Sequence, residues 1–268
     1  MPGRVNTLEL TDLVKVYETG PRVLDGLSLS VPAGSIFGFI GLNGAGKTTT
    51  IRIIAGLLPK SAGSVKLFGR EIDPRDSEHQ KEIGYVLDDP LYFDWMSPRE
   101  YLEFVGTLYH LEEGEPVRRT TELLEFFDLA DKRDEPIGTF STGMKKKVSL
   151  AAAIIHRPSL IILDEPLEGI DALAASAIKE TLAMMAAEGT TIFITSHVLD
   201  TVERFCTDVA IIHDGKIVLR CKTGEIRKLA RGTLKNASYQ SLEELFVEIV
   251  SKRVKKKHLS FLQTGLKP

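Results

Sequence analysis

The chain is organised around Gly41-Leu42-Asn43-Gly44-Ala45-Gly46-Lys47-Thr48, which fits the pattern Gly-x-x-x-x-Gly-Lys-[Ser/Thr]. Glycines at these positions let successive backbone N–H groups curl around an anion, because no Cβ blocks its approach. We expect the Lys47 ammonium to contact β- and γ-phosphates and the Thr48 hydroxyl to bind Mg²⁺. The stretch therefore predicts a phosphate-binding loop with the positive end of a helix dipole behind it.

The segments on either side support this prediction. Residues 36–40 form an apolar run that is typical of a strand buried on both faces. After the loop, apolar residues recur at helical spacing, at Ile51, Ile54, Ala55 and Leu58. Strand, loop and helix thus follow in the order that a phosphate-binding loop requires, whereas a glycine-rich turn without a ligand would need no such order.

Composition limits the fold and the partners. With 268 residues, of which 43% are hydrophobic, the chain can bury one large α/β core with an inserted or appended subdomain. The net charge of -3 gives no general attraction to nucleic acid, so no nucleic-acid partner is expected. Cys206 and Cys221 have neither metal-ligand spacing nor a pairing pattern, and we expect free thiols. No signal segment and no apolar span of about 18 residues is visible, which predicts a chain that stays in the cytoplasm.

Two alternating segments at the N-terminus predict antiparallel strands with one solvated face. Their apolar residues are Leu8, Leu10, Val14 and Val16 and, after a turn at 19–21, Leu27, Leu29 and Val31. Tyr17 ends the first of these strands. Its ring either stacks on a purine base or is an ordinary half-buried tyrosine of the sheet.

The middle of the chain predicts an all-helical insert at about residues 91–155. Short strands are expected before it, at 63–69 and 83–87. Ser97-Pro98-Arg99-Glu100 places a hydroxyl at the N-cap, proline at the first helical position and Glu at the third, which is a capping box. A second amphipathic helix is expected around residues 123–127.

Two buried strands after the insert each end in polar residues. Asp164 and Glu165 follow the apolar run 160–163, and Ser196 and His197 follow the run 191–195. A helix at about 178–185 separates the runs, so they form a βαβ unit whose carboxyl ends carry ligand chemistry. Asp164 is suited to holding Mg²⁺ opposite Thr48, and Glu165 to polarising an attacking water. His197 is suited to donating a hydrogen bond to a γ-phosphate.

A second anion-binding helix start is predicted at Ser141, in the run Phe140-Ser141-Thr142-Gly143-Met144. A small hydroxyl residue and a glycine at a helix start can bind an anion, and the following lysines 145–147 strengthen the local positive field. The alternative is an ordinary N-cap followed by a solvated basic face.

The C-terminal part predicts a hairpin on Asp214-Gly215 and an amphipathic helix around residues 242–249. A basic cluster follows, comprising Lys252, Arg253, Lys255, Lys256 and Lys257. Contact with anionic lipid headgroups and a solvated tail are the two alternatives for it. We divide the chain into residues 1–230 and an extension, 231–268.

Together these motifs resemble the ATP-binding subunit of ABC transporters over essentially residues 6–250. Residues 41–48 resemble its Walker A motif, 160–165 its Walker B motif with the following glutamate, and 141–144 its signature. Residues 169–171 resemble the D-loop and His197 the switch histidine. The resemblance implies an α/β fold in which a P-loop NTPase core, a mostly parallel sheet with helices, carries an N-terminal antiparallel β-subdomain and an inserted α-helical subdomain.

The resemblance implies ATP and Mg²⁺ as cofactors and catalytic roles for Lys47, Glu165 and His197. Nucleotide contacts are expected from Tyr17, Gly41, Asn43, Gly44, Ala45, Gly46, Lys47, Thr48, Thr49, Ser141 and Gly143, and metal contacts from Thr48, Asp164 and Asp88. It further implies a head-to-tail dimer, with an identical or a different ATPase subunit, in which Ser141 and Gly143 of one subunit complete the ATP site of the other. Because the sequence has no evident arginine finger near these motifs, donors from a second subunit agree with the needs of phosphoryl transfer.

Two departures from the family pattern are present. Asp88 stands where the family normally has the Q-loop glutamine, so a carboxylate replaces a neutral amide beside the metal and the triphosphate. Thr142 and Met144 replace a glycine and a glutamine of the signature. With the late run Ser-Leu-Glu-Glu-Leu-Phe at 241–246, this variant resembles the ATPases of ABC-2-type exporters, which work on separate membrane subunits.

The expected function is therefore ATP hydrolysis that drives movement, most simply export, through a transmembrane permease subunit, from the cytoplasmic face of the cell membrane. Tyr92, Phe93, Trp95 and Met96 follow Asp88 and either grip a helix of that permease or pack inward. The alternative is a soluble ABC-type ATPase that acts on the ribosome or DNA. Such proteins usually carry two cassettes or a long coiled coil, and this sequence has one cassette and no heptad run.

Overall fold

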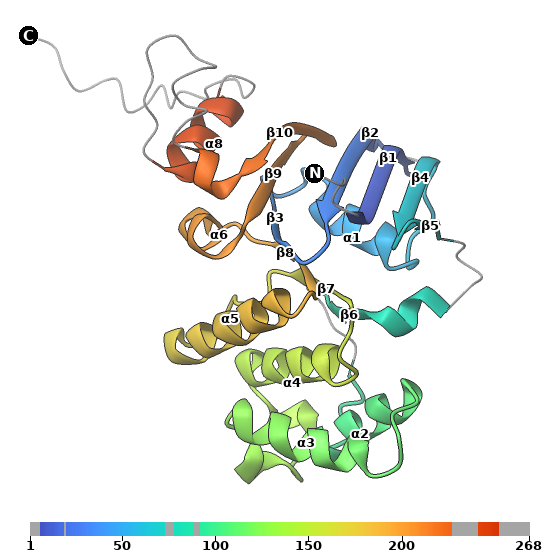
Figure 1. The fold of residues 1–268 in the computed structure, drawn as a ribbon, viewed down its shortest axis with the longest axis vertical. Helices are drawn as coiled ribbons and strands as arrows, with labels where there is room; N and C mark the ends of the chain where they lie inside the picture. The colour runs from blue at the N-terminus through green and yellow to red at the C-terminus, as the bar shows by residue number, and fades with distance from the viewer. Residues whose placement is uncertain (1–5, 19, 73–77, 88–91, 227–240, 252–268) are drawn as a thin grey trace, which may run out of the picture.

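The computed structural model describes residues 6–18, 20–72, 78–87, 92–226 and 241–251. Two β-sheets and a group of helices make up the fold (Figure 1). The N-terminal sheet packs with α1 (Lys47–Ile54) on one side of the second sheet. Three helices, α2 (Pro98–Leu108), α3 (Glu115–Phe126) and α4 (Thr142–Ile154), form the helical segment at the opposite end of the molecule.

The first sheet has the strand order β2-β1-β4-β5 and is antiparallel, as predicted. Its strands are β1 (Asn6–Val16), β2 (Arg22–Pro32), β4 (Ala62–Leu67) and β5 (Arg70–Glu71). Leu8, Leu27 and Val65 of three strands are fully buried on its inner face. Alternation thus places one apolar face on the core, which is how a half-solvated sheet is stabilised.

The predicted alternation is wrong in the second half of β1. The register shifts on both sides of Leu13, and Asp12 has a left-handed backbone with φ 46°. Such a bulge moves the following residues to the other face. Leu13 is therefore fully buried, whereas Val16, expected on the inner face, is 41% exposed.

The second sheet has the order β10-β9-β3-β8-β7-β6. Its strands are β3 (Ile36–Ile40), β6 (Ile83–Val86), β7 (Leu160–Asp164), β8 (Thr191–Thr195), β9 (Asp208–His213) and β10 (Lys216–Lys222). All neighbouring pairs are parallel except β9 and β10, which form the predicted hairpin across Asp214 and Gly215. The carboxyl ends of β3, β7 and β8 consequently lie next to one another at one edge.

Helices cover both faces of this sheet, and two hydrophobic cores result. The core between the two sheets includes Phe37, Phe39 and Phe193 together with α1 (Lys47–Ile54). The other core lies under α5 (Ala172–Ala187) and α6 (Leu199–Phe205) and continues into the helical segment. Leu58, which was expected on the first helix, lies beyond its end and packs on the first core.

The helical segment contains α2 (Pro98–Leu108), α3 (Glu115–Phe126) and α4 (Thr142–Ile154), with short 3₁₀ turns at Ala130–Lys132 and Ile137–Thr139. The predicted capping box is present, because Ser97 Oγ accepts from the Glu100 backbone N–H and the Glu100 carboxylate accepts from the Ser97 N–H. Leu102 and Val148 join α2 and α4 to the second core. Further 3₁₀ turns occupy Glu78–Glu82 and Thr223–Glu225.

His156 sits where the helical segment returns to the sheet. Its ring stacks on Tyr109 with centroids 3.6 Å apart, and burial, with a smaller effect of Arg119, lowers the pKa of His156 to about 4. The folded protein therefore binds fewer protons than the unfolded chain between pH 6.5 and about 4, and its stability falls as the pH drops through this window.

Thermal unfolding midpoints measured between pH 6.5 and about 4 should decline more steeply for the wild type than for His156→Phe, which keeps a stacking ring but does not titrate. Equal slopes would contradict this assignment.

The C-terminal extension contributes α8 (Leu242–Ser251), which packs beside α6 (Figure 1). Leu242 N–H donates to the Glu203 carboxylate of α6, at 2.7 Å. The basic cluster at 252–257 lies outside the described residues. Both cysteines are free thiols, as predicted, and within the described ranges no helix is long and apolar enough to cross a membrane.

Candidate functional site

The predicted phosphate-binding loop connects β3 to α1, so strand, loop and helix follow in the expected order. Gly44 and Gly46 have φ of 80° and 112°, left-handed backbone conformations that are strained for any residue with a Cβ. A Cβ on Gly41 would lie 2.5 Å from the Ile212 carbonyl oxygen. The three glycines are therefore required by the backbone, two for its dihedral angles and one for its close packing on β9.

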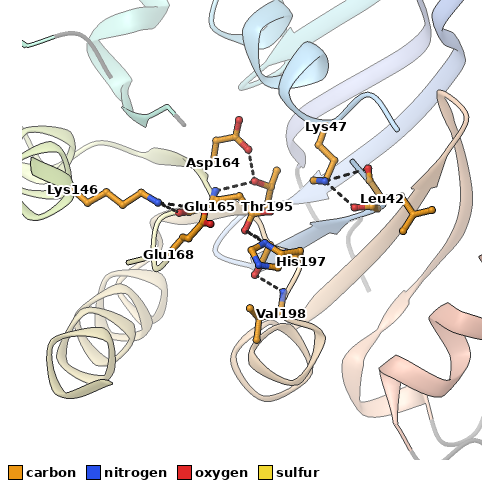
Figure 2. A network of polar contacts seen from close by, with 11 residues as sticks. Leu42, Lys47, Lys146, Asp164, Glu165, Glu168, Thr195, His197 and Val198 are labelled. Atoms are coloured by element: carbon orange, nitrogen blue, oxygen red, sulfur yellow. Dashed lines mark hydrogen bonds and ion pairs between the residues drawn. The ribbon is translucent and has the colours of Figure 1, made fainter. Parts of the chain in front are cut away.

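Lys47 is folded over the loop. Its side chain is buried, and Nζ donates to the carbonyl oxygens of Gly41 at 2.8 Å and Leu42 at 3.4 Å (Figure 2). Asn43 is exposed, Ala45 is buried, and Thr48 and Thr49 in the first turn of α1 are half-buried. The loop thus presents an ammonium group, backbone donors and a helix N-terminus at one place, which is suited to a polyphosphate.

Asp164 ends β7 as a buried carboxylate, with 1% of its surface exposed. One oxygen, Oδ1, accepts a hydrogen bond from the Thr195 hydroxyl at the end of β8. The other, Oδ2, is buried and has no hydrogen-bond partner among the described residues. Buried carboxylate oxygens are costly unless compensated, and a cation would supply that compensation.

Glu165 points away from Asp164 and toward His197, but its backbone is left-handed with φ 47°, whereas an extended backbone was expected directly after the strand. Its Oε2 lies 3.0 Å from His197 Nδ1 and accepts from the His197 backbone N–H at 3.3 Å (Figure 2). Glu165 and His197 follow neighbouring parallel strands, β7 and β8. The fold therefore places a carboxylate and an imidazole side by side at the edge where the loop also lies.

A cleft of about 710 Å³ joins these groups. It is lined by Gly41, Leu42, Asn43, Glu165, Glu168, Ser196, His197, Leu199 and Phe246. The structure thus brings the start of the loop together with Glu165 and His197. Of the other predicted site residues that the structure describes, neither Lys47, Thr48 and Asp164 nor Ser141, Gly143 and Tyr17 line this cleft.

The remaining predicted residues lie elsewhere. Tyr17 follows β1 and is 40% exposed, with the Lys15 ammonium 5.1 Å from its ring centroid. Ser141 is the N-cap of α4, as predicted, and its Oγ accepts from Met144 N–H at 3.3 Å. Asp88 lies outside the described residues.

The alternative that α4 carries a solvated basic face is wrong in part. Lys146 is 6% exposed, and its Nζ donates to the Glu165 carbonyl oxygen at 2.6 Å. Lys147 is also largely covered and lies 3.8 Å from the Asp171 carboxylate. Residues 165–171 pack against this side of the helix, so the lysines have partners that are distant in sequence.

Thr195 is a site residue that the sequence reasoning missed. Its Oγ1 donates to Asp164 and accepts from the Glu165 backbone N–H at 3.1 Å. This hydroxyl fixes both acidic residues to β8. The available signal was a threonine that ends an apolar strand directly before Ser196 and His197.

The aromatic residues before α2 were predicted either to grip a helix of the permease or to pack inward, and the structure shows both orientations. Tyr92 packs against the second core, and its hydroxyl donates to the Lys145 carbonyl at 2.7 Å. Phe93 and Trp95 point outward, being 41% and 75% exposed, and Phe93 also contacts Phe104 of α2, with ring centroids 6.0 Å apart. We refer to Phe93, Trp95 and Phe104 as the aromatic patch.

Known proteins are similar to this chain in sequence and fold. The family described as ABC transporter matches residues 24–168. Linearmycin resistance ATP-binding protein LnrL of Bacillus subtilis (strain 168) is 34% identical over 241 residues, which cover 90% of this chain and 77% of the relative. Bacitracin transport ATP-binding protein BcrA of Bacillus licheniformis is 34% identical over 84% of this chain and 72% of its own length. A solved structure of an ATP-binding subunit of an ABC transporter superposes with a TM-score of 0.82 at 33% identity, covering 91% of this chain and 99% of that one.

Proposed function

This chain belongs to the ABC transporter family as an ATP-binding and ATP-hydrolysing subunit, and we propose that it drives export through a separate membrane subunit. The cleft that joins the start of the phosphate-binding loop to Glu165 and His197 supports ATP hydrolysis as the energy source, since phosphoryl transfer needs those groups around one γ-phosphate. The alternative, an ATPase acting on the ribosome or DNA, is not favoured, because LnrL and BcrA are named for resistance and transport.

The proposed roles follow from the chemistry of each group. Lys47 binds the β- and γ-phosphates once its amine leaves the loop carbonyls, and Glu165 accepts a proton from the attacking water. His197 donates to the γ-phosphate and stays oriented by the Glu165 carboxylate, 3.0 Å from its Nδ1. Ser196 and His197 are thereby held close to the reacting phosphate.

The described residues fit Mg²⁺. Asp164 Oδ2 is the buried oxygen without a partner among the described residues, and Thr48 lies in the first turn of α1. We propose that these two hold the ion, with Asp88 beside it, since hard cations prefer oxygen ligands. The ion would neutralise charge on the phosphate oxygens.

We further propose that the second half of each site comes from another subunit. Ser141 and Gly143 begin a helix whose N–H groups and dipole suit a phosphate, yet they do not line the cleft of their own chain within the described residues. A head-to-tail dimer would bring them to the partner's nucleotide. Tyr17, Asn43, Gly44, Gly46 and Thr49 would contact the nucleotide from the first side.

The aromatic patch is the proposed docking surface for the membrane subunit. It lies on the helical segment, which we assign to an inserted subdomain at 91–155, and exposed aromatic clusters of this kind are enriched at protein interfaces. Docking there would place the chain on the cytoplasmic face of the membrane.

Trp95→Ala is expected to weaken association with the membrane subunit about 30-fold or more, because a buried interface tryptophan is typically worth about 2 kcal/mol or more. The test is co-purification of the tagged chain with a co-expressed candidate membrane subunit. ATPase stimulation by candidate cargo compounds is then measured on the recovered complex.

Phe126→Ala is the control, because Phe126 is also an exposed aromatic residue, 41% exposed against 75% for Trp95, and lies on α3 of the same segment but outside the patch. It should retain the membrane subunit. If both variants retain it equally, the docking surface lies elsewhere on the chain.

A further inference from the structure

A buried lysine, Lys146, links α4 to Glu165, the proposed base of the same chain. We call α4 the signature helix, because it begins at the signature residues 141–144. Lys146 lies in the second turn of α4 and is 6% exposed. Its amine donates to the Glu165 carbonyl oxygen at 2.6 Å, and the nearest paired carboxylate, that of Glu168, is 4.0 Å away. Burying an ammonium group costs free energy unless the group is hydrogen-bonded. The hydrogen bond to the Glu165 carbonyl oxygen compensates this cost and holds the Lys146 amine in one position.

The contact acts on a residue whose backbone is strained. Glu165 has φ 47°, a conformation that non-glycine residues adopt mainly where their surroundings enforce it. Its N–H donates to Thr195 Oγ1 at 3.1 Å, and its carbonyl accepts from Lys146 and, at 3.4 Å, from Glu168 N–H (Figure 2). Thr195 therefore fixes one peptide group of Glu165, and Lys146 fixes the other.

The same helix touches the segment after Glu165 at two further points. A Cβ on Gly143 would lie 2.7 Å from the Gly169 carbonyl oxygen, so the first turn of α4 packs directly on that loop. Lys147 lies 3.8 Å from the carboxylate of Asp171, the N-cap of α5. A movement of α4 is thus transmitted to residues 165–171.

We propose that Lys146 is a positioning residue that sets the orientation of Glu165 and so links the signature helix to the hydrolytic base of its own chain. The inference rests on the proposed function, in which Glu165 is the base and Ser141 closes over the partner's nucleotide. When Ser141 engages that nucleotide, α4 shifts, and Lys146 carries the shift to the Glu165 carbonyl. The occupancy of one site thereby affects the chemistry of the other.

The test uses full-length heterodimers that are purified through two different tags, with one site silenced by Glu165→Gln. In the first, Lys146→Met is in the protomer that retains Glu165. The reference is the heterodimer of one wild-type and one Glu165→Gln protomer. Relative to this reference, we expect kcat to fall about 10- to 100-fold, because the base is misplaced. KM for ATP should change less than about threefold, because the nucleotide contacts remain. In the second, Lys146→Met is in the Glu165→Gln protomer, which supplies only the signature, and kcat should stay within about twofold.

Lys146→Arg should restore most of the activity in the first heterodimer, because a guanidinium can still donate to the carbonyl. Lys146→Gln, whose amide is too short to reach, should behave like Lys146→Met and serves if the methionine variant does not fold. Lys132→Met is the charge control, since the Lys132 ammonium pairs with the exposed Glu135 carboxylate, its one ion pair in the part of the chain that the structure describes.

The outcomes separate this inference from the proposed function. Equal losses in the two heterodimers, or a loss only when the substitution lies in the signature-supplying protomer, would overturn the role of Lys146. If the wild-type homodimer itself hydrolyses no ATP, the proposed function fails first.

Discussion

Glu165→Gln is expected to abolish ATP turnover while leaving ATP binding intact. The Glu165 carboxylate lines the cleft beside the phosphate-binding loop and contacts His197, so it is placed to take a proton from water. An amide of the same shape cannot accept that proton, and a general base typically contributes about 10²- to 10⁴-fold in rate. The variant also removes a negative charge near the triphosphate, which favours binding.

The measurement is phosphate release under steady-state conditions, with size-exclusion chromatography in the presence of ATP to detect an accumulated dimer. Glu168→Gln is the matched control, because Glu168 is a second carboxylate lining the same cleft and its side chain is 58% exposed. It should hydrolyse ATP within a few-fold of the wild-type rate. Undiminished hydrolysis by Glu165→Gln would remove Glu165 from the role of base, and equal losses in the two variants would assign the effect to charge alone.

The sequence predicted those parts of the site that depend on local signals and on parallel strands. The loop at 41–48 has a fixed pattern between a buried run and a helical periodicity, and each part forms as expected. Asp164 and His197 follow apolar runs, and adjacent parallel strands necessarily bring such ends together. Ser97 and Ser141 were predicted as N-caps from neighbours within three residues.

The contacts that were missed join residues far apart in the chain. Lys146 and Glu165 are 19 positions apart, and Thr195 is 31 positions from Asp164. A lysine in a basic run is ordinarily solvated, and nothing local indicates that residues 165–171 cover it. The bulge at Asp12 is a backbone conformation of a single residue, so the alternation of apolar residues could not reveal that the pattern shifts there.

The proposal that each ATP site is composite leads to the second large effect. Ser141 caps a helix at the edge of the helical segment, while the cleft of the same chain is lined by the loop, Glu165 and His197. Lys47→Ala removes the amine that would bind the phosphates, and Ser141→Arg places a bulky side chain at the helix start that would face the partner's nucleotide. Each variant alone should form a dimer with two defective sites and no turnover.

Mixing the Lys47→Ala and Ser141→Arg chains should restore activity to about one quarter of the wild-type rate, because random pairing makes about half of the dimers mixed and each has one intact site. That site combines Lys47 of one protomer with Ser141 of the other. A mixture of Lys47→Ala and Glu165→Gln is the matched control, since both residues belong to the same half of a site and no pairing produces an intact one. Phosphate release from both mixtures, after exchange of subunits, is the measurement. No recovery in the first mixture would place Ser141 and Lys47 in a site formed by one subunit. Recovery in the second mixture would show that Glu165 and Lys47 act on a given nucleotide from different subunits.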